Sequence, residues 1–199
     1  MTDYKTISVY DSQVDNYVEF MDQQPVDKLL LDFIARFEPN DYVLDLGCGP
    51  AISSATMREH GLRVDPTDAS EEMVKLANST FNIGARQAVF ADIDPKCTYD
   101  GIWANYSLLH ATAKDFPDIL KVLHQILKPK GILHLGMKIG QGSIRDKLDR
   151  YYSYYSEDEL LSYLGKAGFV VETVELGEAI GLAGKIEPWI ALTSFAQWN

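Results

Sequence analysis

The segment 43–50 constrains the fold of this chain more than any other. Its sequence, VLDLGCGP, is apolar except for Asp45 and then turns through two glycines. It predicts a buried strand, a tight turn at Gly47 and Gly49, and a helix directly after the turn. The glycines allow backbone angles that other residues resist, and they leave room for a ligand against the backbone. An isolated carboxylate beside such a turn needs a cationic or hydrogen-bonding partner, so we expect Asp45 to have one.

A second acidic position follows about twenty residues later. Asp68 comes after the apolar segment 62–64, at the expected end of a second strand. In nucleoside-binding α/β sheets, an acidic side chain at this place usually binds the ribose hydroxyls. Asp65 would occupy the strand end instead if the register shifted, and Asp68 would then only cap the next helix. We predict Asp68 as the ribose ligand.

These segments resemble the motifs of class I S-adenosylmethionine-dependent methyltransferases, within the broad type 11/type 25 methyltransferase-domain group. The matching regions follow one another in the family's order, and the resemblance covers roughly residues 40–140. They are the glycine turn at 43–50, the second motif at 68–73, the adenine-side motif at 91–93, the fourth strand and its turn at 99–110, and the segment 128–133. The resemblance implies an enzyme that uses S-adenosylmethionine and releases S-adenosylhomocysteine.

The resemblance also implies the cofactor-binding positions, which lie in the glycine turn, at strand ends and around the adenine: Asp45, Gly47, Gly49, Asp68, Ala69, Met73, Asp92, Ile93, Ala104 and Asn105. Asp45 would meet the ammonium group of the cofactor, and Asp92 would accept from the adenine amino group. Three of these residues also have an alternative role that involves no cofactor: Asp45 can cap the turn, Met73 can belong to the core and Asp92 can be a solvated loop acid. Ala51 departs from the family, which often has a glycine there.

Helical and extended patterns alternate along the chain. Apolar spacing and capping signals predict helices at about 12–23, 25–37, 51–61, 70–78, 115–127 and 156–168. Strands are expected at about 42–46, 62–67, 86–90, 100–104, 131–137, 169–176 and 188–195. This order predicts an α/β fold, a three-layer Rossmann-like sandwich around a seven-stranded, mostly parallel sheet. The Gly-rich stretch 177–185, expected to be irregular, is not helical, so the last strand should be antiparallel.

The whole chain, 1–199, is expected to form a single methyltransferase domain. Residues 1–38 would be a helical N-terminal lid segment, residues 39–137 the donor-binding core, and residues 138–199 an acceptor-side loop followed by the C-terminal strands. Within the last part, residues 138–155 read as a polar connection rich in tyrosine and arginine.

Six residues in the lid segment and after the fifth strand are predicted to bind the acceptor: Tyr10, Tyr17, Arg145, Arg150, Tyr151 and Tyr152. The arginines indicate an anionic acceptor, because guanidinium groups bind carboxylates and phosphates at two points. In the alternative interpretation, the arginines pair with Asp146 and Asp149 and the tyrosines only pack. His110 is the candidate catalytic residue, since its pKa can lie near neutrality; it can equally be a structural histidine.

Composition narrows the functional classes. The chain has 199 residues, of which 46% are hydrophobic, as expected for one globular domain. Its net charge of −11 argues against binding long nucleic acid through the phosphates. No apolar run is long enough for a bilayer, and the first residues lack a signal-peptide pattern. A disulfide at Cys48 would disturb the glycine turn, so Cys48 and Cys97 indicate a reduced protein. We expect a cytoplasmic monomer or homodimer with a small-molecule acceptor and no metal ion.

Two other functions fit parts of the sequence. An NAD-dependent oxidoreductase would have a similar turn, but the third glycine of that fingerprint is absent here, and Asp45 suits a cationic ligand better than a pyrophosphate. The second alternative is not an enzyme: it is a module that binds S-adenosylmethionine without turnover and regulates a partner. Titration with S-adenosylhomocysteine and NAD distinguishes the first alternative, and an acceptor screen distinguishes the second.

Overall fold

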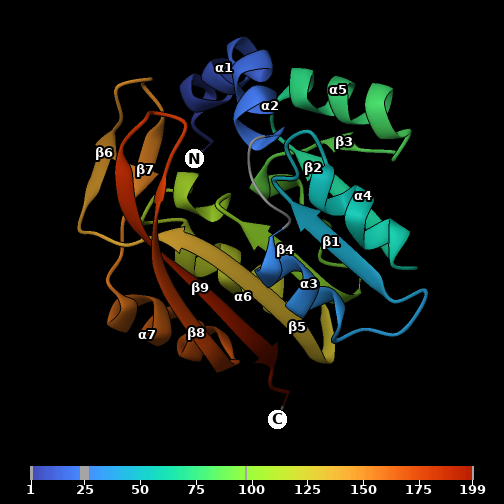
Figure 1. Ribbon diagram of the computed structural model, residues 1–199. Helices are drawn as coiled ribbons and strands as arrows, with labels where there is room; N and C mark the ends of the chain where they lie inside the picture. Colours follow the sequence, from blue (N-terminus) through green and yellow to red (C-terminus); the bar gives the residue numbers. More distant parts are fainter. Residues whose placement is uncertain (1, 23–26, 97, 199) are drawn as a thin grey trace.

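The computed structural model describes residues 2–22, 27–96 and 98–198. It is a three-layer α/β sandwich with helices on both faces of a central sheet (Figure 1), so the predicted fold class is confirmed. The sheet contains β1 (Tyr42–Leu46), β2 (Arg63–Asp68), β3 (Arg86–Gln87), β4 (Tyr99–Asn105), β5 (Leu127–Lys138), β8 (Phe169–Ile180) and β9 (Ile186–Ala196). The helices are α1 (Tyr4–Ser12), α2 (Val14–Asp22), α3 (Lys28–Ile34), α4 (Ile52–Glu59), α5 (Glu71–Phe81), α6 (Phe116–Gln125) and α7 (Glu157–Ala167).

The strand order of the main sheet is β3-β2-β1-β4-β5-β9-β8. The strands from β3 to β5 pair in parallel, whereas β9 is antiparallel to both of its neighbours, as the sequence predicts for the last strand. From β1 the chain first builds outward through β2 and β3, and then returns to add β4 on the other side. This reversal opens a crevice at the carboxyl ends of β1 and β4, the usual place for a ligand in such sheets.

The two larger hydrophobic clusters hold α3, α4, α6 and α7 against the sheet. On one face, Phe33 of α3 and Met57 of α4 pack around Trp103 of β4. On the other face, Leu120 of α6 and Leu164 of α7 join the larger cluster with β5 and β9. Helix α3 is therefore part of the core, whereas α1 and α2, residues 4–22, lie outside both clusters; we call these two helices the lid. Figure 1 shows both lid helices above the carboxyl ends of the strands.

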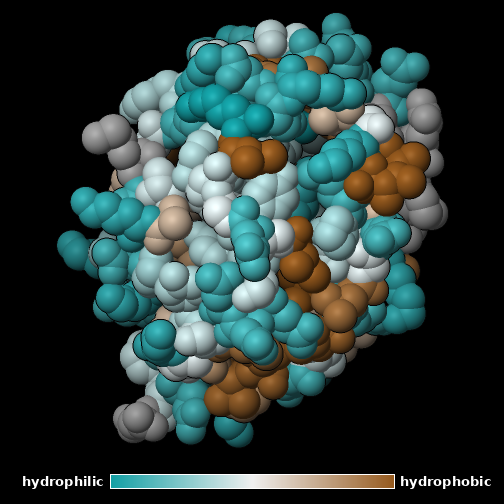
Figure 2. Space-filling model, turned by 90° about the vertical axis from the view of Figure 1, so that its left-hand side faces the viewer, coloured by the Kyte–Doolittle hydropathy of each residue, from teal (hydrophilic) through white to brown (hydrophobic). Residues whose placement is uncertain are grey.

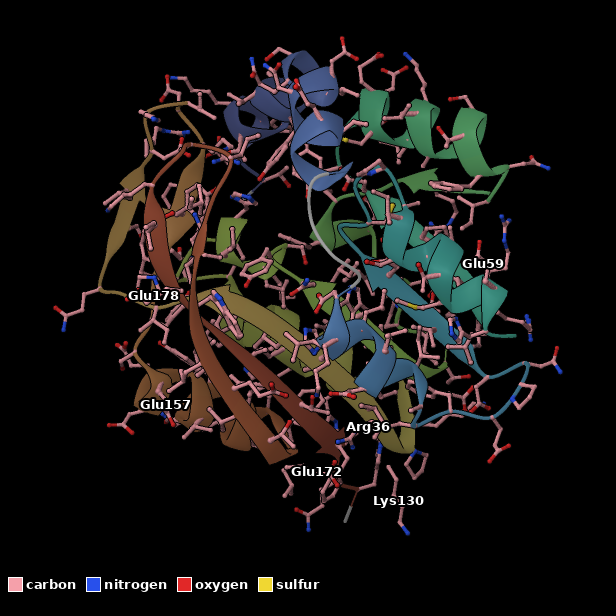
Figure 3. The ribbon with its side chains drawn as sticks, viewed as in Figure 1. Arg36, Glu59, Lys130, Glu157, Glu172 and Glu178 are labelled. Atoms are coloured by element: carbon pink, nitrogen blue, oxygen red, sulfur yellow. The ribbon has the colours of Figure 1, made fainter. Side chains whose placement is uncertain are left out.

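Strand β8 forms one edge of the sheet. Arg36, just after α3, pairs with Glu172 of this strand (Figure 3). Toward the tip of the β8–β9 hairpin, Leu176, Ile180 and Ile186 expose more than half of their surface. On the face of the molecule that carries this hairpin, hydrophobic side chains form a band from the middle toward the bottom (Figure 2).

The structure corrects several predicted boundaries. The chain is helical from residue 4, where Asp3 caps α1 by accepting from two backbone amides, and α1 and α2 replace the single helix expected at 12–23. Strand β3 has only two residues, because a 3-10 turn, η1 (Phe90–Asp92), follows it. The predicted irregular stretch 177–185 is wrong for residues 177–180, because β8 continues to Ile180, whereas residues 181–185 form the turn of the hairpin.

The polar connection also contains regular structure. Strands β6 (Ser143–Arg145) and β7 (Tyr151–Ser153) pair as an antiparallel hairpin where the sequence indicated only a connection. The helix signals that depend on capping are confirmed: Ser70 caps α5, and Ser156 caps α7. The expected start of the second helix at Pro25 and Val26, and Cys97, lie outside the described residues.

Candidate active site

A cavity of about 430 Å³ lies at the carboxyl edge of the sheet, under the lid. Its wall is formed by the turn after β1, the end of β2, the segment 88–93, the end of β4 with the following residues, the first turns of α6, and α1 with Tyr17 of α2. The volume is within the range of small-molecule and cofactor sites, roughly 300–1,000 Å³. The cavity therefore lies where the strand order predicts a ligand.

The glycine turn borders this cavity closely. Gly47 has φ +80°, and a Cβ atom built on it would lie 2.4 Å from Cβ of Ser107. Gly49 has φ +53°, and its Cβ position would be 3.6 Å from the ring of Tyr17 in the lid. Both glycines line the cavity, so the turn has no side chain between its backbone and a ligand. Ala51, the departure from the family pattern, is fully buried and adopts a left-handed conformation with φ +63°.

Asp45 is buried beneath the turn and does not line the cavity. Its carboxylate accepts a hydrogen bond of 2.5 Å from Ser54 of α4. Burial raises the pKa of Asp45 to about 7, because the charged form loses its hydration. The hydrogen-bonding partner expected from the sequence is thus Ser54, and Asp45 supports the turn from below.

Asp68 ends β2 and lines the cavity. Its two carboxylate oxygens accept from the amides of Gly49 and Ser70, both at 2.8 Å. Burial raises its pKa above the usual value, which those two hydrogen bonds oppose. Asp65 lies three residues earlier in the strand, where Arg86 and Tyr99 bind it. The structure therefore places Asp68, and not Asp65, at the cavity.

The segments expected around the adenine converge on the same cavity. Ala69, Met73 and Ile93 line it. Met73 is only 1% exposed, so it also belongs to the buried core. Asp92 is exposed and does not line the cavity; one oxygen of its carboxylate accepts from the amide of Val89 and so closes the η1 turn. For Asp92 the structure thus shows the loop-acid role.

The end of β4 contributes polar groups. Asn105 lines the cavity, and its amide oxygen lies 3.4 Å from Nε2 of His134. Ala104 is in the core and does not reach the wall. Tyr106 has φ +56°, an uncommon conformation for a bulky residue, and also lines the cavity. The buried hydroxyl of Ser107 has no hydrogen-bond partner among the described residues, although it lies on the cavity wall.

His110, in the 3-10 turn η2 (Leu108–His110), and Tyr10 of the lid form a hydrogen-bonded pair on the wall. Nδ1 of His110 lies 2.6 Å from the carbonyl oxygen of Tyr151, which can only accept, so Nδ1 carries the ring hydrogen. Burial lowers the pKa of His110 to about 4, and the neutral ring then accepts from the Tyr10 hydroxyl at 2.8 Å through Nε2.

The structure does not bring the predicted arginines into the cavity. Arg150 is 3% exposed, and its guanidinium donates twice to Asp146, at 2.7 and 3.0 Å, and once to the Tyr10 hydroxyl, at 3.3 Å. Arg145 donates to Asp3 and to the carbonyl of Asp149. The expectation that these arginines face the acceptor is corrected, because carboxylates of the protein already occupy them.

The two tyrosines of β7 also stay behind the wall. Tyr152 is 3% exposed and packs against the ring of His110, with the ring centroids 4.7 Å apart. The ring of Tyr151 packs near Arg145, and its backbone amide donates to the hydroxyl of Thr6 at 2.8 Å. These residues support the groups on the wall, and the predicted direct contact with an acceptor is not seen in their placement.

Polar contacts fasten α1 of the lid at both of its ends. Near its start, Asp3 binds Arg145 at 2.7 Å and Lys5 binds Asp149 at 2.5 Å. Near its end, Asp11 accepts from the hydroxyl of Ser70 at 2.6 Å. The lid therefore joins the β6–β7 hairpin to the turn after β2. Tyr10 and Tyr17, predicted from the sequence, both lie on the wall, whereas a separate helix at 4–12 and the wall residues Thr6 and Ile7 were not predicted; the Asp3 cap was the one local signal for this helix.

The charges on the cavity wall are of one sign. Its ionisable carboxylates belong to Asp3, Asp68, Asp115 and Asp118. Among the described residues, neither a lysine nor an arginine lines the cavity. An anion placed there would meet no cationic side chain on the wall.

A family model described as a methyltransferase domain matches residues 17–174, which is most of the chain. The chain belongs to this methyltransferase family. An uncharacterised methyltransferase of Schizosaccharomyces pombe is 27% identical over 199 residues, which cover 86% of this chain and 76% of that protein. The trans-aconitate 2-methyltransferase of Escherichia coli O157:H7 is 34% identical over 114 residues, which are 54% of this chain and only 44% of the relative.

Solved structures show the same fold. The Burkholderia thailandensis 1,6-didemethyltoxoflavin-N1-methyltransferase, solved with 1,6-didemethyltoxoflavin and S-adenosylhomocysteine, superimposes with a TM-score of 0.77 at 20% identity. The alignment covers 98% of this chain and 88% of that structure. At this identity the likeness concerns the fold alone.

S-adenosylmethionine is the cofactor of this methyltransferase, and the residues present fit it. The turn at Gly47 and Gly49 is a cradle that a Cβ atom would fill. Asp68 offers carboxylate lone pairs to a diol, and the unpartnered hydroxyl of Ser107 offers a polar contact beside the turn. No helix in the described ranges is long and apolar enough to cross a membrane, and no described cluster of three or more His, Cys, Asp or Glu could hold a metal ion.

Proposed function

We propose that this protein transfers the methyl group of S-adenosylmethionine to a small-molecule acceptor enclosed under the lid. The observation that carries the proposal is the shared cavity. One part of its wall is the donor-binding turn with Asp68, and another part is the Tyr10–His110 pair. Related proteins support a small acceptor, since their names specify trans-aconitate and 1,6-didemethyltoxoflavin. The net charge of −11 also disfavours a nucleic-acid acceptor.

The donor residues would have distinct roles. Gly47 and Gly49 would let the donor lie against the backbone, and Asp68 would bind the ribose hydroxyls. Ala69 and Ile93 would border the adenine. Asp45 would act through the turn that it supports, because it does not line the cavity. When bound, S-adenosylmethionine supplies a methyl group on a sulfonium sulfur, which a nucleophile can displace in line.

The acceptor side would work mainly by positioning and by exclusion of water. Holding two reactants in line removes much of the entropic barrier to a bimolecular step. The lid supplies Thr6, Ile7 and Tyr10 to the wall, so the acceptor would be enclosed when α1 is fastened. The expected division of the chain changes accordingly: the lid is residues 4–22, and α3 belongs to the donor-binding core.

The anionic acceptor expected from Arg145 and Arg150 is not supported by the structure. Arg150 is held by Asp146, and Arg145 by Asp3. The described wall carries carboxylates and no cationic side chain, so a carboxylate acceptor would lose hydration without gaining an ion pair. We therefore propose a small acceptor without assigning it a negative charge.

Donor binding is the first test of this function. S-adenosylhomocysteine should bind the wild-type protein in calorimetry, and NAD should not. Asp68→Ala should weaken the binding by about tenfold or more, since hydrogen bonds to a charged group contribute ~1.5–3 kcal/mol. Asp65→Ala is the matched control and should leave the affinity unchanged, because Asp65 binds Arg86 and Tyr99 away from the cavity. A larger loss in Asp65→Ala, or binding of NAD alone, would contradict the proposal.

A further inference from the structure

The Tyr10–His110 pair places a proton acceptor behind a hydroxyl of the cavity wall. Because the Tyr151 carbonyl fixes the hydrogen on Nδ1, Nε2 of His110 carries a lone pair. The Tyr10 hydroxyl donates to this lone pair at 2.8 Å and accepts from Arg150 at 3.3 Å. A tyrosine oxygen has two lone pairs, and the hydroxyl of Tyr152 interacts with the second one, so a donor from the cavity would take the place of Tyr152 there.

The surroundings of the pair are suited to a neutral partner. Two cationic side chains, Arg150 before β7 and Lys138 of β5, lower the pKa of His110, and the carboxylate of Asp146 raises it. Both cations are engaged, Arg150 by Asp146 and Lys138 by Glu187. Neither lines the cavity, so neither offers an ion pair to a ligand there.

From these two observations, and resting on the function proposed above, we propose the chemical class of the acceptor. It is an uncharged molecule whose nucleophilic nitrogen or oxygen still carries a proton, and Tyr10 passes this proton to Nε2 of His110. Lactam or imide nitrogens, N–H heterocycles and phenols have this chemistry. A carboxylate does not, because it has already lost its proton at neutral pH and needs no base.

The step conserves atoms and charge. The acceptor atom forms a bond to the methyl carbon while the carbon–sulfur bond of the donor breaks and leaves its electron pair on sulfur. The acceptor proton moves to the oxygen of Tyr10, and the hydroxyl proton of Tyr10 moves to Nε2 of His110. The positive charge that began on the sulfonium is then on the imidazolium, and solvent removes the proton after the product leaves.

The buried position of His110 serves this step. Burial lowers its pKa to about 4, so the ring is neutral before the reaction and can accept. A weak base is sufficient, because a protonated lactam, imide or phenol ether is a strong acid once the methyl group has been added. Arg150 is a positioning residue: its hydrogen bond to Tyr10 holds the hydroxyl in place and stabilises negative charge on the oxygen as the proton moves.

The protonation state can be measured without knowing the acceptor. In nitrogen-15 NMR of histidine-labelled protein with S-adenosylhomocysteine, His110 should be the neutral Nδ1–H tautomer at neutral pH. Tyr10→Phe should shift the Nε2 signal, since it removes the hydrogen bond. Tyr4→Phe, in the same helix but 71% exposed, is the control and should not shift it. An Nε2–H tautomer, or an imidazolium at neutral pH, would refute the proposal because neither can accept a proton at Nε2.

The acceptor class can be read from the product. Wild-type protein is incubated with tritium-methyl-labelled S-adenosylmethionine and a small-molecule cell extract, and the product is treated with mild base. Methylated nitrogens and phenols should retain the label, whereas methyl esters would release it as volatile methanol. Tyr10→Phe should slow the labelling by about 10²–10⁴-fold, the usual range for general acid–base groups, with donor affinity unchanged. Tyr4→Phe should label at the wild-type rate.

The outcomes separate the two proposals. Failure of S-adenosylhomocysteine to bind would remove the proposed function itself. Normal donor binding with release of the label as methanol, or with equal rates in Tyr10→Phe and wild type, would leave the methyltransferase function standing and overturn the acceptor class. Normal donor binding with no labelled product would also count against the class, provided that the NMR experiment shows a ring unable to accept.

Discussion

Replacing Gly47 with alanine tests the closest approach in the site. The residue has φ +80°, which is unfavourable for an L-residue by about 1–2 kcal/mol. The new Cβ atom would lie 2.4 Å from Cβ of Ser107, so the backbone or Ser107 must move; overpacking of this kind costs about 1–3 kcal/mol. Together these effects should lower the free energy of unfolding by about 2–5 kcal/mol.

Gly84→Ala is the matched control. Gly84 has a similar φ of +77°, but a Cβ atom there meets nothing within 4 Å. Only the conformational term applies, so urea unfolding should show Gly47→Ala to be less stable than Gly84→Ala by about 1–3 kcal/mol. In a thermal melt this corresponds to roughly 2–12 °C for a chain of this size. Adding Ser107→Gly should recover most of the difference. If the two single variants are equally stable, the contact between the glycine turn and Ser107 does not exist.

Two further perturbations address buried charges. Asp146→Ala leaves the guanidinium of Arg150, among the described residues, with the Tyr10 hydroxyl and the rings of Tyr10 and Tyr152 but no carboxylate; breaking a buried pair in this way should lower the free energy of unfolding by about 3–5 kcal/mol in a urea titration. The pKa of Asp45 is about 7 in the folded protein, so between pH 4 and 7 the folded state holds a proton that the unfolded state lacks, and stability falls as pH rises. Between pH 5 and pH 8, the free energy of unfolding should fall by about 2–3 kcal/mol more in the wild type than in Asp45→Asn, because the variant has no carboxyl group to titrate there. An identical pH profile of stability in the two proteins would contradict the raised pKa of Asp45.

Much of the donor side of the cavity wall was predictable because local rules dictate it, although Asp45, Asp92 and Ala104 do not reach the wall. A turn that needs positive φ at Gly47 and Gly49 requires glycine, and the strand before it must be apolar to be buried. Asp68 follows from the length of the connection to the second strand. Among the alternatives left open on this side, the one between Asp65 and Asp68 was a register question, and the pairing of β2 with β1 and β3 puts Asp68 at the strand end.

The acceptor side was harder to predict from the sequence, because contacts between residues far apart in the chain determine it. Arg150 looks like an anion-binding residue in sequence, but the β6–β7 hairpin brings Asp146 onto its guanidinium. Helix α1 has little apolar periodicity, and its place over the cavity depends on partners more than a hundred residues away, such as Tyr151 and Arg145. Strand β8 was predicted too short because Gly177 and its polar neighbours resemble a loop, whereas cross-strand pairing with Trp189 keeps them extended.

The family match begins at residue 17, whereas α1 ends at Ser12. Thr6, Ile7 and Tyr10 therefore line the cavity from a segment that lies outside this match. This helix is joined to the rest of the protein by contacts of side chains such as Asp3, Thr6 and Asp11, and not by the sheet. If α1 closes over the acceptor as proposed, grafting a different helix onto the same core should change which molecule is methylated and leave cofactor use untouched.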